Sequence, residues 1–213
     1  FGSAAKYVAQ LFSGINYDVK SLPGVYLGIV MGRHAGFLTA SSSLLKKESD
    51  DGPNLIYIPE SPFQVNTFLS QVKTVFNKYG RCVIAISEGI QDKNKKLISQ
   101  KITKKTEYDA HGNIQLSGTG SLGDYLSEEI KEKLKLPRVR ADTLGYPQRC
   151  FLGSISEIDQ KEALKIAIFA SKYSNKNNTS FSAGILERKK FTVPYRTAFI
   201  ANSLEMVAGK TKV

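Results

Sequence analysis

The sequence predicts an α/β fold with a mainly parallel sheet covered by helices on both faces. Short β-branched segments alternate with amphipathic segments at helical spacing along the first 90 residues, and this alternation is typical of βαβ units. The strand segments are nearly continuous apolar runs, which indicates strands that are buried on both faces. We therefore expect a three-layer αβα arrangement.

The first elements read in order as helix, strand and helix-compatible segment. Residues 1–22 predict a helix, because apolar residues recur at helical spacing and the sequence Leu22-Pro23-Gly24 ends it. The run from Val25 to Val30 predicts a buried strand that stops at Gly32. The segment HAGFLTASSSLLKK that follows has a composition compatible with a helix.

The same alternation then continues for two more strands. Asn54 to Ile58 predicts a strand that is closed by Pro59. Apolar residues keep strict helical spacing from Pro62 to Tyr79, and Gly80 ends that helix. Cys82 to Ile86 predicts the next buried strand.

The middle of the chain is less regular. Between Gly89 and Gly120 we expect a polar, Lys-rich surface excursion with a hairpin around His111-Gly112-Asn113. Ser121 to Asp124 has the spacing of a capping box and predicts a helix that runs to Leu134.

The last third predicts fewer elements. Val139 to Arg149 is expected to form a strand and a turn. A second capping-box pattern, Ser156 to Asp159, predicts a helix that ends at about Tyr173. A strand from Ser182 to Glu187 and a mixed tail complete the chain.

Composition excludes several classes of protein. With 213 residues and 41% hydrophobic residues, the chain can bury a substantial core. The longest apolar stretches, Val25 to Met31 and Cys82 to Ile86, are far shorter than the roughly 20 residues that a bilayer requires, so we expect no membrane association. Two cysteines cannot build a disulfide framework, and we expect a reducing, cytoplasmic setting.

The chain carries a formal charge of +11, which implies an anionic partner or a basic surface that serves solubility. Nucleic acid is disfavoured, because the basic residues are spread along the chain and no nucleic-acid-binding signature is present. The densest basic stretch, Asp92 to Lys105, is interpreted as a solvated loop. Small phosphorylated substrates would also account for the excess of positive charge.

One glycine motif has a structural interpretation. The sequence from Gly118 to Gly123 matches the dinucleotide fingerprint GxGxxG, but the fingerprint needs a buried apolar strand directly upstream. Ile114 to Leu116 is short and has polar flanks. We interpret the motif as a glycine-rich helix entry.

Three segments follow the carboxyl ends of predicted parallel strands, where open α/β sheets bind their ligands. They are Met31-Gly32-Arg33, Glu88, and the turn from Tyr146 to Arg149. A guanidinium beside a glycine suits a phosphate or sugar oxygen, and a carboxylate accepts hydrogen bonds from sugar hydroxyls. We expect the three segments to form one site.

Four separated segments make the sequence recognisable: VMGRHAGFLTA (30–40), YIPESPF (57–63), RCVIAISEGI (81–90) and RADTLGYPQR (140–149). In order and spacing they resemble the phosphofructokinase family, specifically its pyrophosphate-dependent branch, and the resemblance extends from Phe1 to LEMVAGKTK near the end of the chain. It implies the Rossmann-like fold of that family, with a fructose 6-phosphate-binding region at about 20–150 and a following helix and tail at 151–213.

The resemblance also implies roles for individual residues. The MGR turn, Met31 to Arg33, would hold fructose 6-phosphate, and Glu88 would contact the sugar. Tyr146 and Arg149 would contact the sugar and its phosphate. Arg140 stands where the family has an arginine that reaches the sugar phosphate of a neighbouring subunit, so the resemblance implies a homo-oligomer, a dimer or a tetramer.

Two family segments do not occur in these 213 residues. They are the GGD segment, which binds the phosphoryl donor with Mg²⁺, and the PKTxDND segment, whose Asp acts as the base on the sugar hydroxyl. We therefore assign no catalytic and no metal-binding residue to this chain. We expect it to be the carboxyl-terminal part of a longer enzyme and to be inactive alone, with Mg²⁺ bound mainly by the other segments.

The activity that the resemblance implies belongs to glycolysis: phosphoryl transfer from pyrophosphate to the 1-hydroxyl of fructose 6-phosphate, which gives fructose 1,6-bisphosphate. Pyrophosphate is favoured over ATP as the donor, because ATP-dependent relatives tend to have a GHxQRGG turn where this chain has GYPQRCF. The alternative is a non-catalytic, sugar-phosphate-binding or regulatory subunit that pairs with a catalytic, amino-terminal companion chain.

Overall fold

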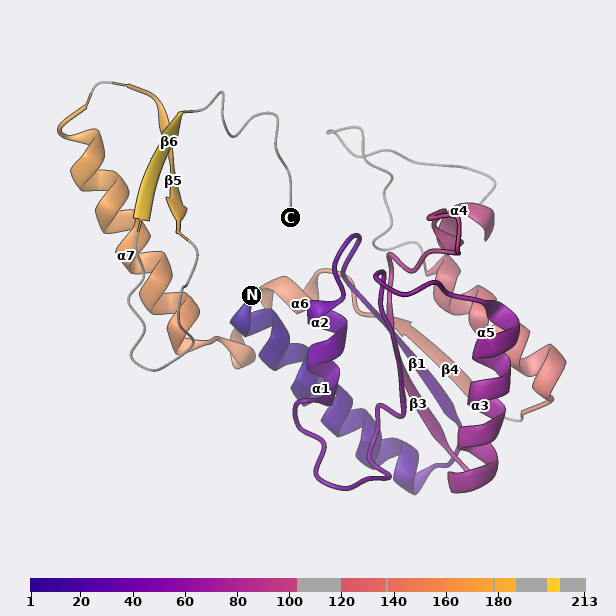
Figure 1. The fold of residues 1–213 in the computed structure, drawn as a ribbon. Coiled ribbons are helices and arrows are strands. Elements are labelled where there is room, and N and C mark those ends of the chain that lie inside the picture. The colour runs from indigo at the N-terminus through magenta and orange to yellow at the C-terminus, as the bar shows by residue number, and fades with distance from the viewer. Residues whose placement is uncertain (103–119, 137, 178, 187–198, 204–213) are drawn as a thin grey trace. The chain divides into compact units, whose positions relative to one another are not determined.

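The computed structural model describes residues 1–102, 120–136, 138–177, 179–186 and 199–203 (Figure 1). The chain divides into two compact units. The first comprises Phe1 and Ser3–Ser154, and the second comprises Gly2 and Ile155–Val213. The predicted hairpin around 111–113 lies outside the described residues.

A parallel sheet forms the centre of the first unit. Its strands are β1 (Val25–Val30), β2 (Leu55–Tyr57), β3 (Cys82–Ser87) and β4 (Val139–Thr143). Their order is β2-β3-β1-β4, and each neighbouring pair is parallel. Because β1 is hydrogen-bonded on both sides, it lies inside the sheet. The predicted α/β class and parallel sheet are confirmed.

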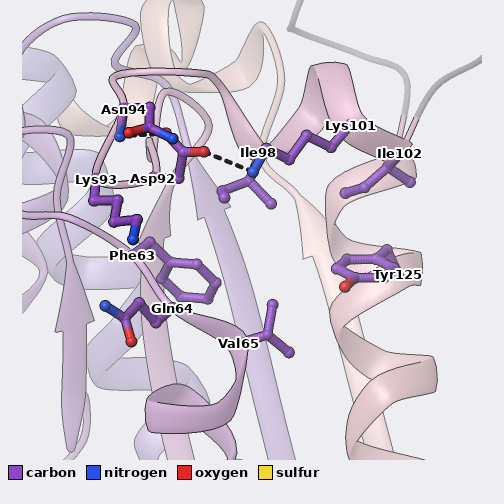
Figure 2. Close-up of a pocket in the computed structure, with 10 residues that line it drawn as sticks. All are labelled: Phe63, Gln64, Val65, Asp92, Lys93, Asn94, Ile98, Lys101, Ile102 and Tyr125. Carbon is purple, nitrogen blue, oxygen red and sulfur yellow. Dashed lines mark hydrogen bonds and ion pairs between the residues drawn. The ribbon is translucent and has the colours of Figure 1, made fainter.

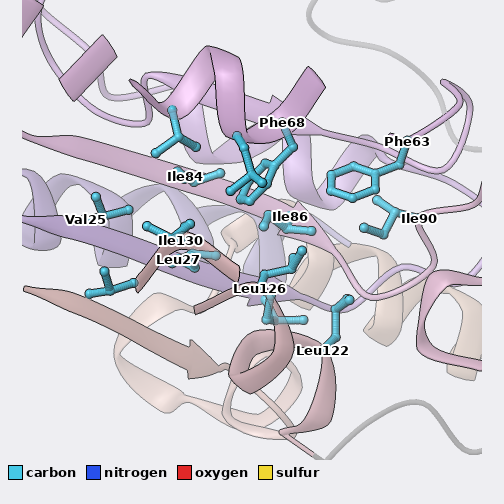
Figure 3. Packing of buried hydrophobic residues seen from close by; sticks show 14 of the residues in the cluster. Val25, Leu27, Phe63, Phe68, Ile84, Ile86, Ile90, Leu122, Leu126 and Ile130 are labelled. Carbon is cyan, nitrogen blue, oxygen red and sulfur yellow. The ribbon is translucent and has the colours of Figure 1, made fainter. Parts of the chain in front are cut away.

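Helices cover both faces of this sheet. On one face, α1 (Gly2–Ser21) buries Val8 and Phe12 in a cluster with Val30. On the other face, α3 (Val65–Tyr79) and α5 (Ser121–Leu134) pack against the opposite side of β1 and β3. Figure 3 shows the side chains of this second cluster, among them Val25, Leu27, Phe68, Ile84, Ile86, Leu126 and Ile130. The three-layer arrangement is therefore confirmed.

The amphipathic pattern located α3 well. The helix ends where the sequence predicts, because Gly80 takes the left-handed conformation (φ 68°) and donates its N–H to Phe76 O over 2.7 Å. It begins three residues later than Pro62. The backbone there is extended at Gln64, and Phe63 N donates to Gln91 O over 2.7 Å, so this segment is held by the loop after β3.

Two capping predictions had different outcomes. Ser156 caps α7 (Glu157–Ser174) as predicted, because its hydroxyl accepts a hydrogen bond from Asp159 N over 3.5 Å. The capping box at Ser121 is wrong, since Ser121 is the first residue of α5 and Gly120 (φ 66°) is the cap, with no side-chain cap hydrogen bond. The expected glycine-rich helix entry is thus confirmed at Gly120.

The helix-compatible segment after β1 forms only α2 (Phe37–Ala40) and a single 3₁₀ turn, η1 (Ser41–Ser43). Each of the three serines in that turn donates its hydroxyl to a carbonyl three residues earlier, over 2.6, 2.6 and 2.9 Å. Such local bonds compete with the main-chain bonds that would extend a helix.

Several short elements were not predicted from the sequence. Within the Lys-rich stretch lies α4 (Ile98–Ile102), where Lys101 forms an ion pair with Asp92 over 2.6 Å. The turn after β4 contains α6 (Pro147–Cys150), and η2 (Leu152–Ser154) follows it.

In the second unit, β5 (Phe181–Ile185) pairs antiparallel with β6 (Phe199–Ser203). The expected strand from Ser182 corresponds to β5, whereas the tail was expected to be mixed and β6 was missed. In the part of the chain that the structure describes, no helix is long and apolar enough to cross a bilayer.

A buried carboxylate joins α1 to the loop before β2. Asp51 accepts hydrogen bonds from Asn16 Nδ2 at 2.9 Å, Lys20 Nζ at 2.6 Å, and the backbone N–H groups of Lys47 and Glu48, both at 3.0 Å. The Lys20 ammonium, followed by the two backbone donors, holds the pKa of Asp51 far below its usual range.

We predict that Asp51→Asn destabilises the first unit by about 2 kcal/mol at neutral pH, because every group facing Asp51 is a donor and an amide NH₂ would face one of them. A carboxylate with a depressed pKa stabilises the fold above its unfolded pKa, and this contribution is lost as the pH falls. The difference in the free energy of unfolding between wild type and Asp51→Asn should therefore become smaller below about pH 4.

The measurement is urea unfolding at a series of pH values. Asp18→Asn is the control, since Asp18 is exposed and forms a long surface ion pair, 4.0 Å between Asp18 Oδ2 and Arg138 Nη2. This substitution should shift the unfolding free energy by less than about 0.5 kcal/mol. Equal effects of the two substitutions at neutral pH would contradict the role assigned to Asp51.

Candidate functional site

The carboxyl ends of β3, β1 and β4 bring three loops to one edge of the sheet. The MGR turn (Met31–Arg33) follows the middle strand, Glu88 follows β3, and the segment that contains Tyr146 and Arg149 follows β4. Because all the strands run in the same direction, these loops leave the sheet side by side. Loops separated by more than 50 residues in sequence therefore share one surface.

The end of β3 fixes the MGR turn. Glu88 N donates to Val30 O over 2.9 Å, and Gly89 N donates to Gly32 O over 3.2 Å. The Ser87 hydroxyl also donates to Gly32 O. These bonds extend the β1–β3 pairing past the last ladder pair, Val30 and Ser87, so the MGR turn is hydrogen-bonded to the loop after β3.

Glu88 is a half-buried carboxylate in the loop that follows β3 at this edge. Its Oε1 accepts a hydrogen bond from Gly32 N over 3.4 Å. Burial raises the pKa of Glu88, and the Gly32 N–H and the nearby positive charge of Arg33 oppose that rise. The remaining acceptor capacity of the carboxylate suits a hydroxyl donor.

A polar recess adjoins Glu88. It has a volume of about 10 Å³, comparable to the space that one water molecule occupies. Its walls come from β1, the loop after β3, α4, the start of α5 and the end of β4. The lining residues are Ile29, Glu88, Ser99, Gly120, Ser121, Leu122 and Thr143. The start of α5 thus belongs to the same edge of the sheet as Glu88.

On the other side of β1, the turn after β4 presents an aromatic ring and a guanidinium. The Arg149 guanidinium carbon lies 4.6 Å from the centre of the Tyr146 ring, which is the distance of a cation–π contact. Tyr146 is 58% exposed, and Arg149 is also exposed. Among the described residues no carboxylate pairs with Arg149, so its donors are open to a ligand.

Arg140 does not join the other six predicted residues. It is the second residue of β4 and pairs in register with Tyr26 of β1, three residues before the strand ends at Thr143. At about 3.3 Å per residue, Arg140 lies roughly 10 Å along the strand from the carboxyl end. It is exposed on a strand whose second side pairs with no strand among the described residues.

The structure therefore brings together six of the seven residues that were predicted as substrate-binding. It also reveals two residues that the sequence analysis missed, Ser87 and Gln148, which hold the turns in place. A polar residue that ends an apolar strand, as Ser87 does, was a usable signal. Nothing in the sequence showed that Gln148 is buried.

A second, larger cavity of about 630 Å³ lies on the α3 and α5 face of the sheet (Figure 2). Apolar side chains form much of its wall, and the Asp92–Lys101 ion pair lies at its rim. None of the seven predicted residues lines it: its walls are Phe63, Gln64, Val65, Asp92, Lys93, Asn94, Ile98, Lys101, Ile102 and Tyr125. We place the candidate site at the sheet edge, because the polar groups converge there.

Comparison with known proteins agrees with this architecture. The sequence profile of the family described as Phosphofructokinase matches residues 1–173. The chain belongs to the phosphofructokinase family. A pyrophosphate–fructose 6-phosphate 1-phosphotransferase of Rhodospirillum rubrum is 50% identical to it over 212 residues, an alignment that covers 100% of this chain and 52% of the relative.

Two further relatives extend the comparison. A sulfofructose kinase of Alkalicoccus urumqiensis is 30% identical over 211 residues, which are 98% of this chain and 51% of the relative. The crystal structure of a pyrophosphate-dependent phosphofructokinase from Marinobacter aquaeolei superposes with a TM-score of 0.74 at 26% identity, over 99% of this chain and 47% of that one. The chain thus spans about half the length of the curated relatives that it matches.

We predict that Gly89→Ala disturbs the MGR turn, because a Cβ on Gly89 would overlap the carbonyl oxygen of Arg33. Overpacking against main chain should destabilise the first unit by about 1–3 kcal/mol. Gly14→Ala is the matched control: it lies exposed within α1 with nothing within 4 Å of the new methyl group. The control should stabilise the fold by about 0.5–1 kcal/mol.

Chemical unfolding of both variants measures the change in the free energy of unfolding, which should fall for Gly89→Ala and rise for Gly14→Ala. A Gly89→Ala protein as stable as wild type would mean that the close approach between the loop after β3 and the MGR turn does not constrain the site.

Proposed function

We propose that this chain is the fructose 6-phosphate-binding part of a pyrophosphate-dependent 6-phosphofructokinase. The observation that carries the proposal is the convergence of the MGR turn, Glu88, Tyr146 and Arg149 at one edge of the sheet. These groups match the parts of a phosphorylated sugar: guanidinium groups can bind the phosphate, a carboxylate can accept a hydrogen bond from a hydroxyl, and an aromatic ring can pack against the sugar.

Each group has a role that follows from its chemistry. The Arg149 guanidinium would bind two phosphate oxygens at once, and its stacking on Tyr146 limits the directions in which it can point. The Glu88 carboxylate would accept a hydrogen bond from a sugar hydroxyl on the side of β3. Arg33, at the end of the MGR turn, would add positive charge between them.

The phosphoryl donor is proposed from the relatives. The relative with 50% identity is named for pyrophosphate and fructose 6-phosphate, whereas the sulfofructose kinase is 30% identical. Pyrophosphate is therefore the proposed donor.

The acceptor sugar has an alternative. Sulfofructose carries an anionic sulfur group, which an arginine guanidinium can also bind. The acceptor is therefore tested with both sugars, and a preference for sulfofructose would replace fructose 6-phosphate in the proposal.

The reaction would break the P–O bond between one phosphorus atom of pyrophosphate and the bridging oxygen, and the bridging oxygen would leave with the other phosphorus as orthophosphate. It would form a new P–O bond to the 1-oxygen of the sugar, and the hydroxyl proton would pass to a base. We propose that segments outside this chain supply the donor site, Mg²⁺ and that base. Among the described residues, no three His, Cys, Asp or Glu side chains gather to hold a metal ion. The residues of this chain would contribute acceptor positioning and charge stabilisation, and the isolated chain should show no turnover.

We predict that Arg149→Ala weakens fructose 6-phosphate binding by roughly tenfold to a hundredfold, because a charge-assisted, bidentate phosphate contact contributes about 1.5–3 kcal/mol. Arg149→Lys should recover part of the loss, since it keeps the charge and loses the fork. The measurement is the KM for fructose 6-phosphate and for pyrophosphate in the natural full-length protein.

Lys131→Ala, an exposed change on α5, is the control and should leave both constants unchanged. Circular dichroism checks that each variant is folded. An equal rise in both KM values for Arg149→Ala, or an unchanged KM for the sugar phosphate, would remove Arg149 from the proposed site.

Arg140 enters the proposal through assembly. Its position on an exposed edge strand, away from the carboxyl end, is compatible with a contact to the sugar phosphate of a second subunit. We therefore predict that the natural full-length protein is at least a dimer and that Arg140→Ala raises the KM for fructose 6-phosphate. Light scattering that showed a fully active monomer would leave Arg140 without this role.

A further inference from the structure

Gln148 bridges the two loops that would carry the sugar-phosphate ligands. Its side-chain oxygen accepts a hydrogen bond from Met31 N over 3.0 Å, and its side-chain nitrogen donates to Gly145 O over 2.9 Å. The residue is only 3% exposed, although it belongs to the otherwise exposed segment Tyr146 to Cys150. A buried amide with both of its ends hydrogen-bonded has one orientation.

We propose that Gln148 is a positioning residue: it sets the separation between the MGR turn and the turn that carries Tyr146 and Arg149. The inference rests on the proposed function, and it adds a residue whose own side chain need not touch the substrate. Gln148 directly precedes Arg149 in the chain, so a shift of its backbone passes to the guanidinium across one peptide unit.

The two sides of the MGR turn differ in how they are held. Toward β3, the turn is fixed by Ser87, Glu88 and Gly89, through both main chain and side chains. Toward β4, the ladder ends where Leu144 N donates to Ile29 O over 3.0 Å. Beyond that bond, the Gln148 side chain contacts the MGR turn from the β4 side.

The chemistry of the bridge explains why a glutamine stands there. The Met31 N–H needs an acceptor and the Gly145 carbonyl needs a donor, and the carboxamide supplies both without a charge. Methionine has nearly the same length and supplies neither. An ionised glutamate supplies the acceptor and would direct an oxygen at the Gly145 carbonyl.

The experiment compares Gln148→Met with wild type in the natural full-length protein by two measurements. The first is steady-state kinetics: the KM for fructose 6-phosphate should rise at least about fivefold, the effect of losing roughly one hydrogen bond's net free energy, while the KM for pyrophosphate stays within about twofold. A general loosening of the fold would raise both constants.

The second measurement, hydrogen exchange at the Met31 amide, does not depend on activity. This amide should be protected in wild type and should exchange at least about fivefold faster in Gln148→Met. Gln71→Met is the matched control, because it makes the same change on α3 and removes one hydrogen bond, from the Tyr57 hydroxyl at 2.6 Å. It should alter neither the Met31 exchange rate nor the sugar-phosphate KM.

The outcomes separate the two proposals. If wild type does not use fructose 6-phosphate, the proposed function fails, and the Met31 exchange rate still decides whether Gln148 holds the turn. If wild type is active and Gln148→Met keeps both the wild-type KM and the wild-type Met31 exchange, the positioning role is wrong. Should Gln148→Met fail to fold, Gln148→Glu replaces it. In that variant the Met31 amide should stay protected, and the KM for fructose 6-phosphate should be higher than in wild type. An unchanged KM for fructose 6-phosphate would overturn the proposal.

Discussion

The pairing of β1 with a parallel strand on each side is the constraint on which the rest of the structure depends. Val25 is in register with Cys82 of β3 and with Val139 of β4, and the register continues until the strands end. The loops after residues 30, 87 and 143 must therefore leave the sheet at the same level. A slip of one residue in either pairing would turn the buried side chains of β1 to the opposite face and separate these loops.

Each face of the sheet maintains this register by packing. Leu27 and Ile29 lie among the side chains of α3 and α5, whereas Val30 lies with Val8 and Phe12 of α1. The rigid layers then support loops whose conformations are held by hydrogen bonds. The MGR turn is anchored to the end of β3 by main-chain bonds and to the β4 side by the Gln148 amide. Under the proposed role of Gln148, this arrangement would hold Arg149, the next residue in the chain, at the edge of the sheet.

Charge is distributed over this structure in two ways. At Asp51, a carboxylate with little exposed surface is surrounded by donors and is held ionised by Lys20, so it joins α1 to a loop. At Glu88, burial raises the pKa and fewer donors oppose the rise. The Asp51 oxygens accept four hydrogen bonds from the protein itself, whereas Glu88 accepts one from Gly32 and can accept more from a hydroxyl group. The difference in surroundings, rather than in residue type, separates a structural carboxylate from a candidate binding one.

The sequence by itself determined the layers and the four parallel strands of the first unit, and it identified the family, because apolar periodicity and segments such as VMGRHAGFLTA report directly on burial and on local motif. It also predicted six residues that meet at one edge, since parallel strands end together. The tertiary structure alone decided which backbone group each turn contacts. Burial of Gln148, the position of Arg140 along β4, and the choice of Gly120 over Ser121 as the cap of α5 depend on contacts between distant segments. Such contacts form only when the sheet has brought those segments together, so no local pattern records them.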